Sequence, residues 1–67
     1  MYETDTLTRT EARRFEAWLD KNIGTEVQNN DHGYGEFTLT IFDLEEAGEV
    51  EQVRAYENAK GYTNEKL

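Results

Sequence analysis

The spacing of apolar residues predicts a helix in the first third of the chain. At 100° per residue, a single apolar stripe about 80° wide is formed by Ala12, Phe15, Leu19 and Ile23. Thr8 and Glu11 have the three-residue spacing of a capping box, and Gly24 can adopt the left-handed conformation that ends many helices. Together these signals predict a helix over Thr8–Ile23.

After this helix the pattern changes to a period of two, which predicts an antiparallel β-hairpin. A short alternation over Thr25–Gln28 indicates a first strand, and a longer alternation begins at Glu36. The segment between them, Asn29–Gly35, reads NNDHGYG and consists of turn-forming residues. We expect one face of the second strand to pack on the helix through Phe37, Leu39 and Ile41. The other face carries Thr38 and Thr40 and is expected to be solvated or open to a partner.

A second helix is predicted by a repeat of the capping signals. Asp43 and Glu46 again have the spacing of a capping box, which places the helix start at Leu44, and Gly61 is a suitable stop. A modest apolar stripe is formed by Val50, Val53 and Tyr56.

The predicted elements define a fold of the α+β class. We expect a single small domain over residues 1–67, in the order helix, antiparallel β-hairpin, helix, with both helices packed on one face of the sheet. Residues 1–6 and 62–67 have no periodic pattern and are expected to be loose ends. The sequence is also compatible with a third strand formed by either terminus.

Composition argues against several functional classes. The chain has 15 acidic and 7 basic residues and a formal net charge of −8, the wrong sign for holding DNA or RNA directly through phosphate contacts. It contains no cysteine and no serine, and no motif places a base beside a nucleophile, so we expect neither an enzyme nor a metal or other cofactor. No apolar segment has the length of a membrane span or of a signal-peptide core, so a cytoplasmic protein is expected.

The acidic residues are unevenly distributed along the chain. Between Lys21 and Arg54 there are 32 residues without Lys or Arg, and the eight acidic residues among them are Glu26, Asp31, Glu36, Asp43, Glu45, Glu46, Glu49 and Glu51. The rest of the chain has as many bases as acids, so this segment carries the whole net charge. The pattern predicts one strongly acidic surface that binds a basic partner. A hydrated acidic face, favoured in part by the dipole of the second helix, is the alternative.

Two residues of the predicted turn, His32 and Tyr34, have side chains suited to specific roles. His32 is the only histidine, and beside Asp31 in a turn it is expected to be a solvated loop residue. Tyr34 lies between two glycines and near Glu36, so it is the aromatic residue that we most expect in a contact with a partner.

In size, acid excess and lack of catalytic motifs, the chain resembles the small acidic inhibitors that phages encode, including anti-CRISPR proteins and other DNA mimics. The resemblance rests on the segment TEVQNNDHGYGEFTLTIFDLEEAGEVE and covers no family signature. It implies a non-catalytic protein of the host cytoplasm that occupies the nucleic-acid-binding groove of a complex such as a CRISPR effector. In that interpretation Glu45, Glu46 and Glu49 face Lys or Arg of the target, and Glu36 and Asp31 extend the row.

The rival hypothesis is a small adaptor or assembly module that binds by shape. Its surface would be the edge of the strand carrying Thr38 and Thr40, or the helix face carrying tyrosine. Binding that depends on charge favours the inhibitor, and binding that is insensitive to charge favours the adaptor. In either case a monomer is expected.

Overall fold

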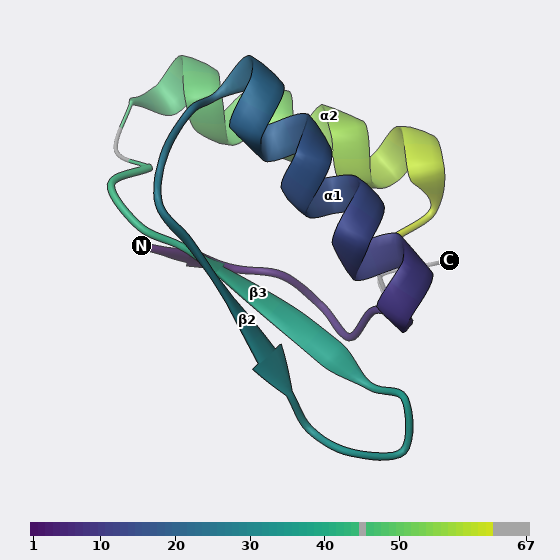
Figure 1. Ribbon diagram of the computed structural model, residues 1–67. Helices are drawn as coiled ribbons and strands as arrows, with labels where there is room; N and C mark the ends of the chain where they lie inside the picture. Colours follow the sequence, from purple (N-terminus) through teal and green to yellow (C-terminus); the bar gives the residue numbers. More distant parts are fainter. Residues whose placement is uncertain (45, 63–67) are drawn as a thin grey trace.

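The protein folds as two helices on one side of a three-stranded antiparallel sheet (Figure 1). The computed structural model describes residues 1–44 and 46–62. In chain order the elements are β1 (Tyr2–Glu3), α1 (Arg9–Asn22), β2 (Val27–Asp31), β3 (Phe37–Ile41) and α2 (Ala47–Lys60). The strand order in the sheet is β1-β3-β2, so β3 is the central strand. This arrangement confirms the predicted α+β class.

Helix α1 forms where its capping signals predicted it. The Thr8 hydroxyl accepts a hydrogen bond from the backbone N–H of Glu11, and the Glu11 carboxylate accepts one from the backbone N–H of Thr8. The helix ends at the cap residue Ile23, and Gly24 follows with a φ of 74°. Its buried face consists of Ala12, Phe15 and Leu19.

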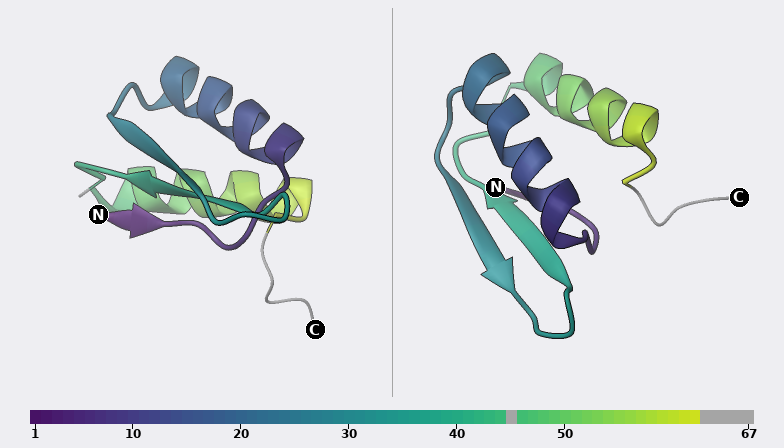
Figure 2. Two further views of the ribbon diagram at one scale, coloured as in Figure 1. Left: turned by 60° about the horizontal axis from the view of Figure 1, so that its bottom comes forward. Right: turned by 45° about the vertical axis from the view of Figure 1, so that its right-hand side comes forward.

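The β2–β3 hairpin is longer than the sequence predicted. Asn29 and Asp31 were expected in the turn but belong to β2, whose register with β3 runs from Val27↔Ile41 to Asp31↔Phe37. The turn is therefore short and is closed by a hydrogen bond of 2.8 Å from His32 N–H to the Glu36 carbonyl. It projects beyond the helical layer (Figure 2). The predicted apolar face of β3 is confirmed, because its buried side chains are Phe37, Leu39 and Ile41.

The expectation that residues 1–6 form a loose arm is wrong, because this segment supplies the third strand. Tyr2 and Glu3 pair with the end of β3, and Thr4 N–H donates to the Leu39 carbonyl at 3.0 Å. Leu7 then forms an isolated bridge with Phe37. A strand of two residues is too short to produce a periodic pattern in the sequence. Its position is determined by its pairing with β3.

The predicted start of α2 is wrong by three residues. Asp43 has a left-handed φ of 58°, whereas a helix N-cap is extended. The chain turns there and buries Leu44, which is 4% exposed, and α2 begins at Ala47 after the cap residue Glu46. The predicted stop is confirmed, since Gly61 has a φ of 72° and ends the helix.

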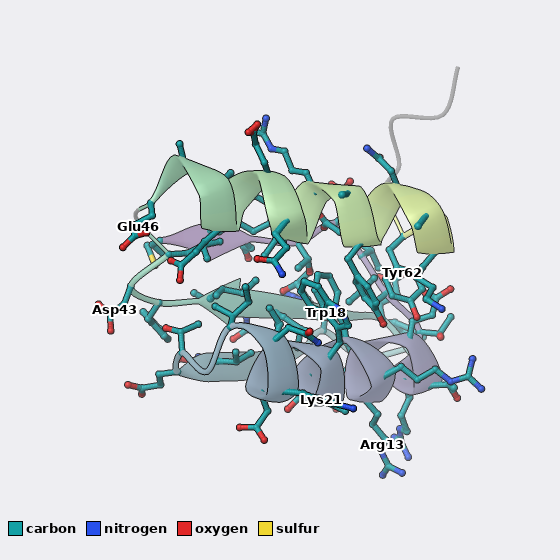
Figure 3. All side chains as sticks on the ribbon, turned by 90° about the horizontal axis from the view of Figure 1, so that it is seen from above. Arg13, Trp18, Lys21, Asp43, Glu46 and Tyr62 are labelled. Atoms are coloured by element: carbon teal, nitrogen blue, oxygen red, sulfur yellow. The ribbon has the colours of Figure 1, made fainter. Side chains whose placement is uncertain are left out.

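The core lies between the sheet and the two helices. Its buried side chains are Leu7, Ala12, Phe15, Leu19, Phe37, Leu39, Ile41, Leu44, Val53 and Tyr62. Tyr62, which was assigned to a loose tail, is therefore packed, and the rest of that predicted tail lies outside the described residues. Trp18 and Tyr62 extend between the helices (Figure 3), and the Trp18 ring stacks on Tyr56 with ring centroids 4.3 Å apart.

Candidate acidic binding surface

Two chain segments bring acidic residues together where β2 begins and β3 ends. Glu26 immediately precedes β2, and Asp43 follows β3 by two residues. The segments are joined by a hydrogen bond of 2.9 Å from Phe42 N–H to the Glu26 carbonyl, and the Thr25 hydroxyl donates to the Phe42 carbonyl. Glu26 and Asp43 are both exposed.

The start of α2 adds two more carboxylates to this region. Glu46 is the exposed N-cap residue, and Glu49 lies half-buried in the first turn, where its N–H donates to the Glu46 carbonyl at 3.0 Å. We call Glu26, Asp43, Glu46 and Glu49 the acidic end. Figure 3 shows Asp43 and Glu46 at the opposite end of the molecule from Arg13. The positive end of the α2 dipole favours acids in its first turn, which gives part of this cluster a structural explanation.

The remaining acidic residues do not continue this cluster as one row. Asp31 and Glu36 flank the hairpin turn at the other end of β3, about 13 Å away for a strand of this length. Glu51 is exposed on α2, and Glu45 lies outside the described residues. Of the acids that the sequence placed in one row, Glu46 and Glu49 lie at the start of α2, whereas Asp31 and Glu36 lie beside the hairpin turn.

Tyr34 is the most exposed aromatic residue of the described chain. Its side chain is 102% exposed at the tip of the hairpin, and its φ of 55° lies in the left-handed region. Both neighbouring glycines also have positive φ, and the Asp31 carboxylate accepts a hydrogen bond of 2.8 Å from Gly33 N–H. The tip therefore presents an exposed tyrosine ring, with Asp31 and Glu36 on either side of it in the sequence.

The threonine strand does not offer the free edge that the adaptor hypothesis required. β3 is paired on both sides, and Thr38 is only 9% exposed. The Thr38 hydroxyl lies 2.8 Å from His32 Nε2, and Asn30 Nδ2 donates to the Thr40 hydroxyl at 2.9 Å. His32 lies outside the strands and is exposed, as expected of a loop residue, and its ring also contacts the Thr38 hydroxyl.

A hydrogen-bonded pair that the sequence did not reveal, formed by a half-buried tyrosine and a buried glutamate, connects β1 to α2. The Tyr2 hydroxyl donates to Glu57, whose side chain is 5% exposed. Burial raises the pKa of Glu57, and burial together with the neighbouring Glu57 carboxylate raises the pKa of Tyr2 to about 12. The partners are 55 residues apart, so no local pattern could indicate the contact. We assign it a structural role, because it secures the N-terminal strand beneath α2.

Two other kinds of feature, a metal-binding cluster and a membrane-spanning helix, are absent from the described residues. In residues 1–44 and 46–62, no group of three or more His, Cys, Asp or Glu side chains is placed to hold a metal ion. No helix in the described part of the chain is long and apolar enough to cross a membrane. Comparison with protein-family models, curated proteins and solved structures finds no match to this chain.

Proposed function

We propose that this protein is a non-catalytic inhibitor that binds a basic nucleic-acid-binding surface through its acidic end. The proposal is supported by one observation above all: Glu26, Asp43 and Glu46 converge from separate segments at one end of the molecule. They lie within a stretch of the sequence that contains no Lys or Arg. The target of this inhibitor is a DNA- or RNA-handling complex, such as a CRISPR effector.

Carboxylates can occupy such a surface because they share the chemistry of phosphates toward cations. Arg forms paired, charge-assisted hydrogen bonds with both groups, and Lys pairs with both as a point charge. Each exposed pair contributes only about 0.2–1 kcal/mol, so several pairs must form together. The excess of negative charge also steers the encounter with a basic groove and speeds association.

The test compares two variants that remove the same charge at different places. Asp43→Asn with Glu46→Gln neutralises half of the acidic end, and asparagine tolerates the left-handed backbone at position 43. Glu11→Gln with Glu36→Gln neutralises two acids at the other end of β3, because Glu11 follows Leu7, which pairs with Phe37, and glutamine can keep the capping bond to Thr8. Each pair removes two negative charges, so the net charge of the two variants is the same.

The assay measures displacement of a fluorescent 20-base-pair duplex from the heparin-retained proteins of a bacterial lysate. We expect the native chain to displace the duplex, and the acidic-end variant to do so about 3–10-fold less well, from the loss of two exposed charge pairs. The control variant should retain the native potency. Equal loss in both variants, or no displacement by the native chain, would contradict the proposal. Binding of protein targets that does not weaken as salt rises would favour the adaptor instead.

A further inference from the structure

The outer edge of β2 presents backbone groups that no described strand uses. His32 N–H donates to the Glu36 carbonyl, and Phe42 N–H donates to the Glu26 carbonyl. These two bonds show that the even-numbered residues from 26 to 32 are the ones whose backbone groups bond to β3. In an antiparallel pair, residues that alternate with the bonded ones direct their N–H and C=O groups to the other side. On β2 these are Val27, Asn29 and Asp31. Asn29 and Asp31 are exposed, and Val27 is half-buried.

This edge lacks the protection that the opposite edge of the sheet has. β1 contains two residues, and between the pairs Glu3↔Thr40 and Leu7↔Phe37 three residues of the N-terminal segment face two of β3, as in a β-bulge. Short strands, bulges, lysines and prolines are the usual means of preventing strand addition. β2 has five residues in unbroken register with β3 and contains neither lysine nor proline.

The charge beside the edge indicates what kind of strand it accepts. Asn29 Nδ2 donates to the Glu16 carboxylate at 2.6 Å, which holds an acidic group of α1 beside the middle of β2. If β2 of a second copy paired antiparallel with this edge, Asn29 opposite Asn29, the two Glu16 carboxylates would lie close together and repel each other. The two chains, each with a net charge of −8, would repel as well. A segment with a Lys or Arg at the position opposite Asn29 would instead meet an opposite charge.

We propose that the outer edge of β2 is a docking site for an extended, basic segment of a partner protein, which adds to the sheet as a fourth strand. The segment pairs with the outward N–H and C=O groups of Val27, Asn29 and Asp31. The side chains of Val27 and Asn29 are on the sheet face that carries α1. The residue of the segment opposite Asn29 is therefore Lys or Arg, which meets Glu16, and the residue opposite Val27 is apolar, since Val27 packs against the core. This site goes beyond the proposed function, because it uses backbone groups and not the side chains of the acidic end.

The experiment uses the heptapeptide TKTKTVT, blocked at both ends, as a probe of the native chain. In antiparallel pairing its two lysines lie opposite Asp31 and Asn29, and its valine lies opposite Val27. Amide hydrogen exchange is followed by NMR in the presence and absence of saturating peptide. We expect exchange at Val27, Asn29 and Asp31 to slow by about tenfold or more, because their N–H groups become hydrogen-bonded. The amides of Gln28 and Asn30 already belong to the β2–β3 ladder and should change little.

Two matched variants separate strand addition from simple charge attraction. Asn29→Pro removes the outward N–H, leaves the ladder of β2 with β3 intact and keeps the net charge. Asn29→Ala loses the same side-chain bond to Glu16 but keeps the N–H. We expect Asn29→Pro to lose peptide binding at least tenfold relative to Asn29→Ala. If Asn29→Pro does not fold, the native chain is titrated with the peptide N-methylated at alternate residues, which should fail to bind.

Several results would overturn the proposal. Equal binding by the two variants, or by the N-methylated peptide, would show that only charge attracts the probe. Protection confined to residues outside β2 would place the peptide elsewhere. A dimer in sedimentation velocity, with the Val27, Asn29 and Asp31 amides already protected in the absence of peptide, would show that a second copy covers the edge. The Asp43→Asn, Glu46→Gln variant should still show protection at Asn29, so failure of the proposed function and failure of this inference can be distinguished.

Discussion

Replacing Tyr2 with phenylalanine tests how the N-terminal strand is held. The change removes one hydroxyl, the donor to the 5% exposed carboxylate of Glu57, and leaves the ring in place. A buried acceptor left without its donor costs about 1–3 kcal/mol, and more when it is charged. A domain of this size has a total free energy of unfolding of about 3–10 kcal/mol. Tyr2→Phe should therefore remove a large fraction of the stability near pH 7.

The penalty should depend on pH in a defined direction. Burial is the largest influence on Glu57 and raises its pKa above the ordinary value of 4.5, while the Tyr2 hydroxyl lowers it. A raised folded-state pKa contributes stability that is complete below 4.5 and is lost as pH rises through the folded value. Removing the hydroxyl raises that pKa further, so the penalty of Tyr2→Phe should be larger at pH 7 than at pH 4.

Urea unfolding followed by Trp18 fluorescence measures these free energies. Glu57→Gln is the matched control, because its side-chain oxygen can still accept the Tyr2 hydroxyl while the ionisable group is gone. We expect the pH dependence of the Tyr2→Phe penalty to disappear in the Glu57→Gln background. A penalty below about 0.3 kcal/mol, or one equal at pH 4 and pH 7 in the native background, would refute the reasoning, because the hydroxyl would then not stabilise a buried carboxylate.

Three further changes test other parts of the fold. Tyr34→Gly should raise the free energy of unfolding by about 0.5 kcal/mol in the isolated protein, because relief of the left-handed backbone exceeds the entropy cost of glycine, and a decrease measured by urea unfolding would contradict this. Thr8→Ala should cost about 1 kcal/mol by removing the cap of α1, with thermal unfolding monitored by circular dichroism; an unchanged midpoint would show that the cap is dispensable. Leu39→Ala should lower the free energy of unfolding, measured by urea unfolding, by about 2–5 kcal/mol, because Leu39 is fully buried. The control Asp20→Asn, at an exposed position, should lower it by less than about 0.5 kcal/mol, and equal effects of the two changes would show that Leu39 is not part of the core.

The elements that the sequence predicted well are those with local signals. Helix α1 has its cap, stripe and stop within one segment, and each is realised. The same capping pattern at Asp43 failed, because the burial of Leu44 holds the chain in a turn and delays the helix. Strand β1 and the Tyr2–Glu57 pair could not be predicted from the sequence, also because they depend on contacts outside their own segment. Both consist of contacts between residues far apart in the sequence, which no local pattern records.

The sequence indicated which residue types would form the candidate surfaces but not where they would lie. Their positions depend on the register between β2 and β3. Phe37, Leu39 and Ile41 are buried on one face of β3, and a slip of one residue would move all three to the polar face. The register that buries them also sets Phe42 opposite Glu26, which brings the acidic end together. It also directs the N–H and C=O groups of alternate β2 residues outward. The core of β3 thus positions both the acidic end and the free edge, although none of its side chains belongs to either.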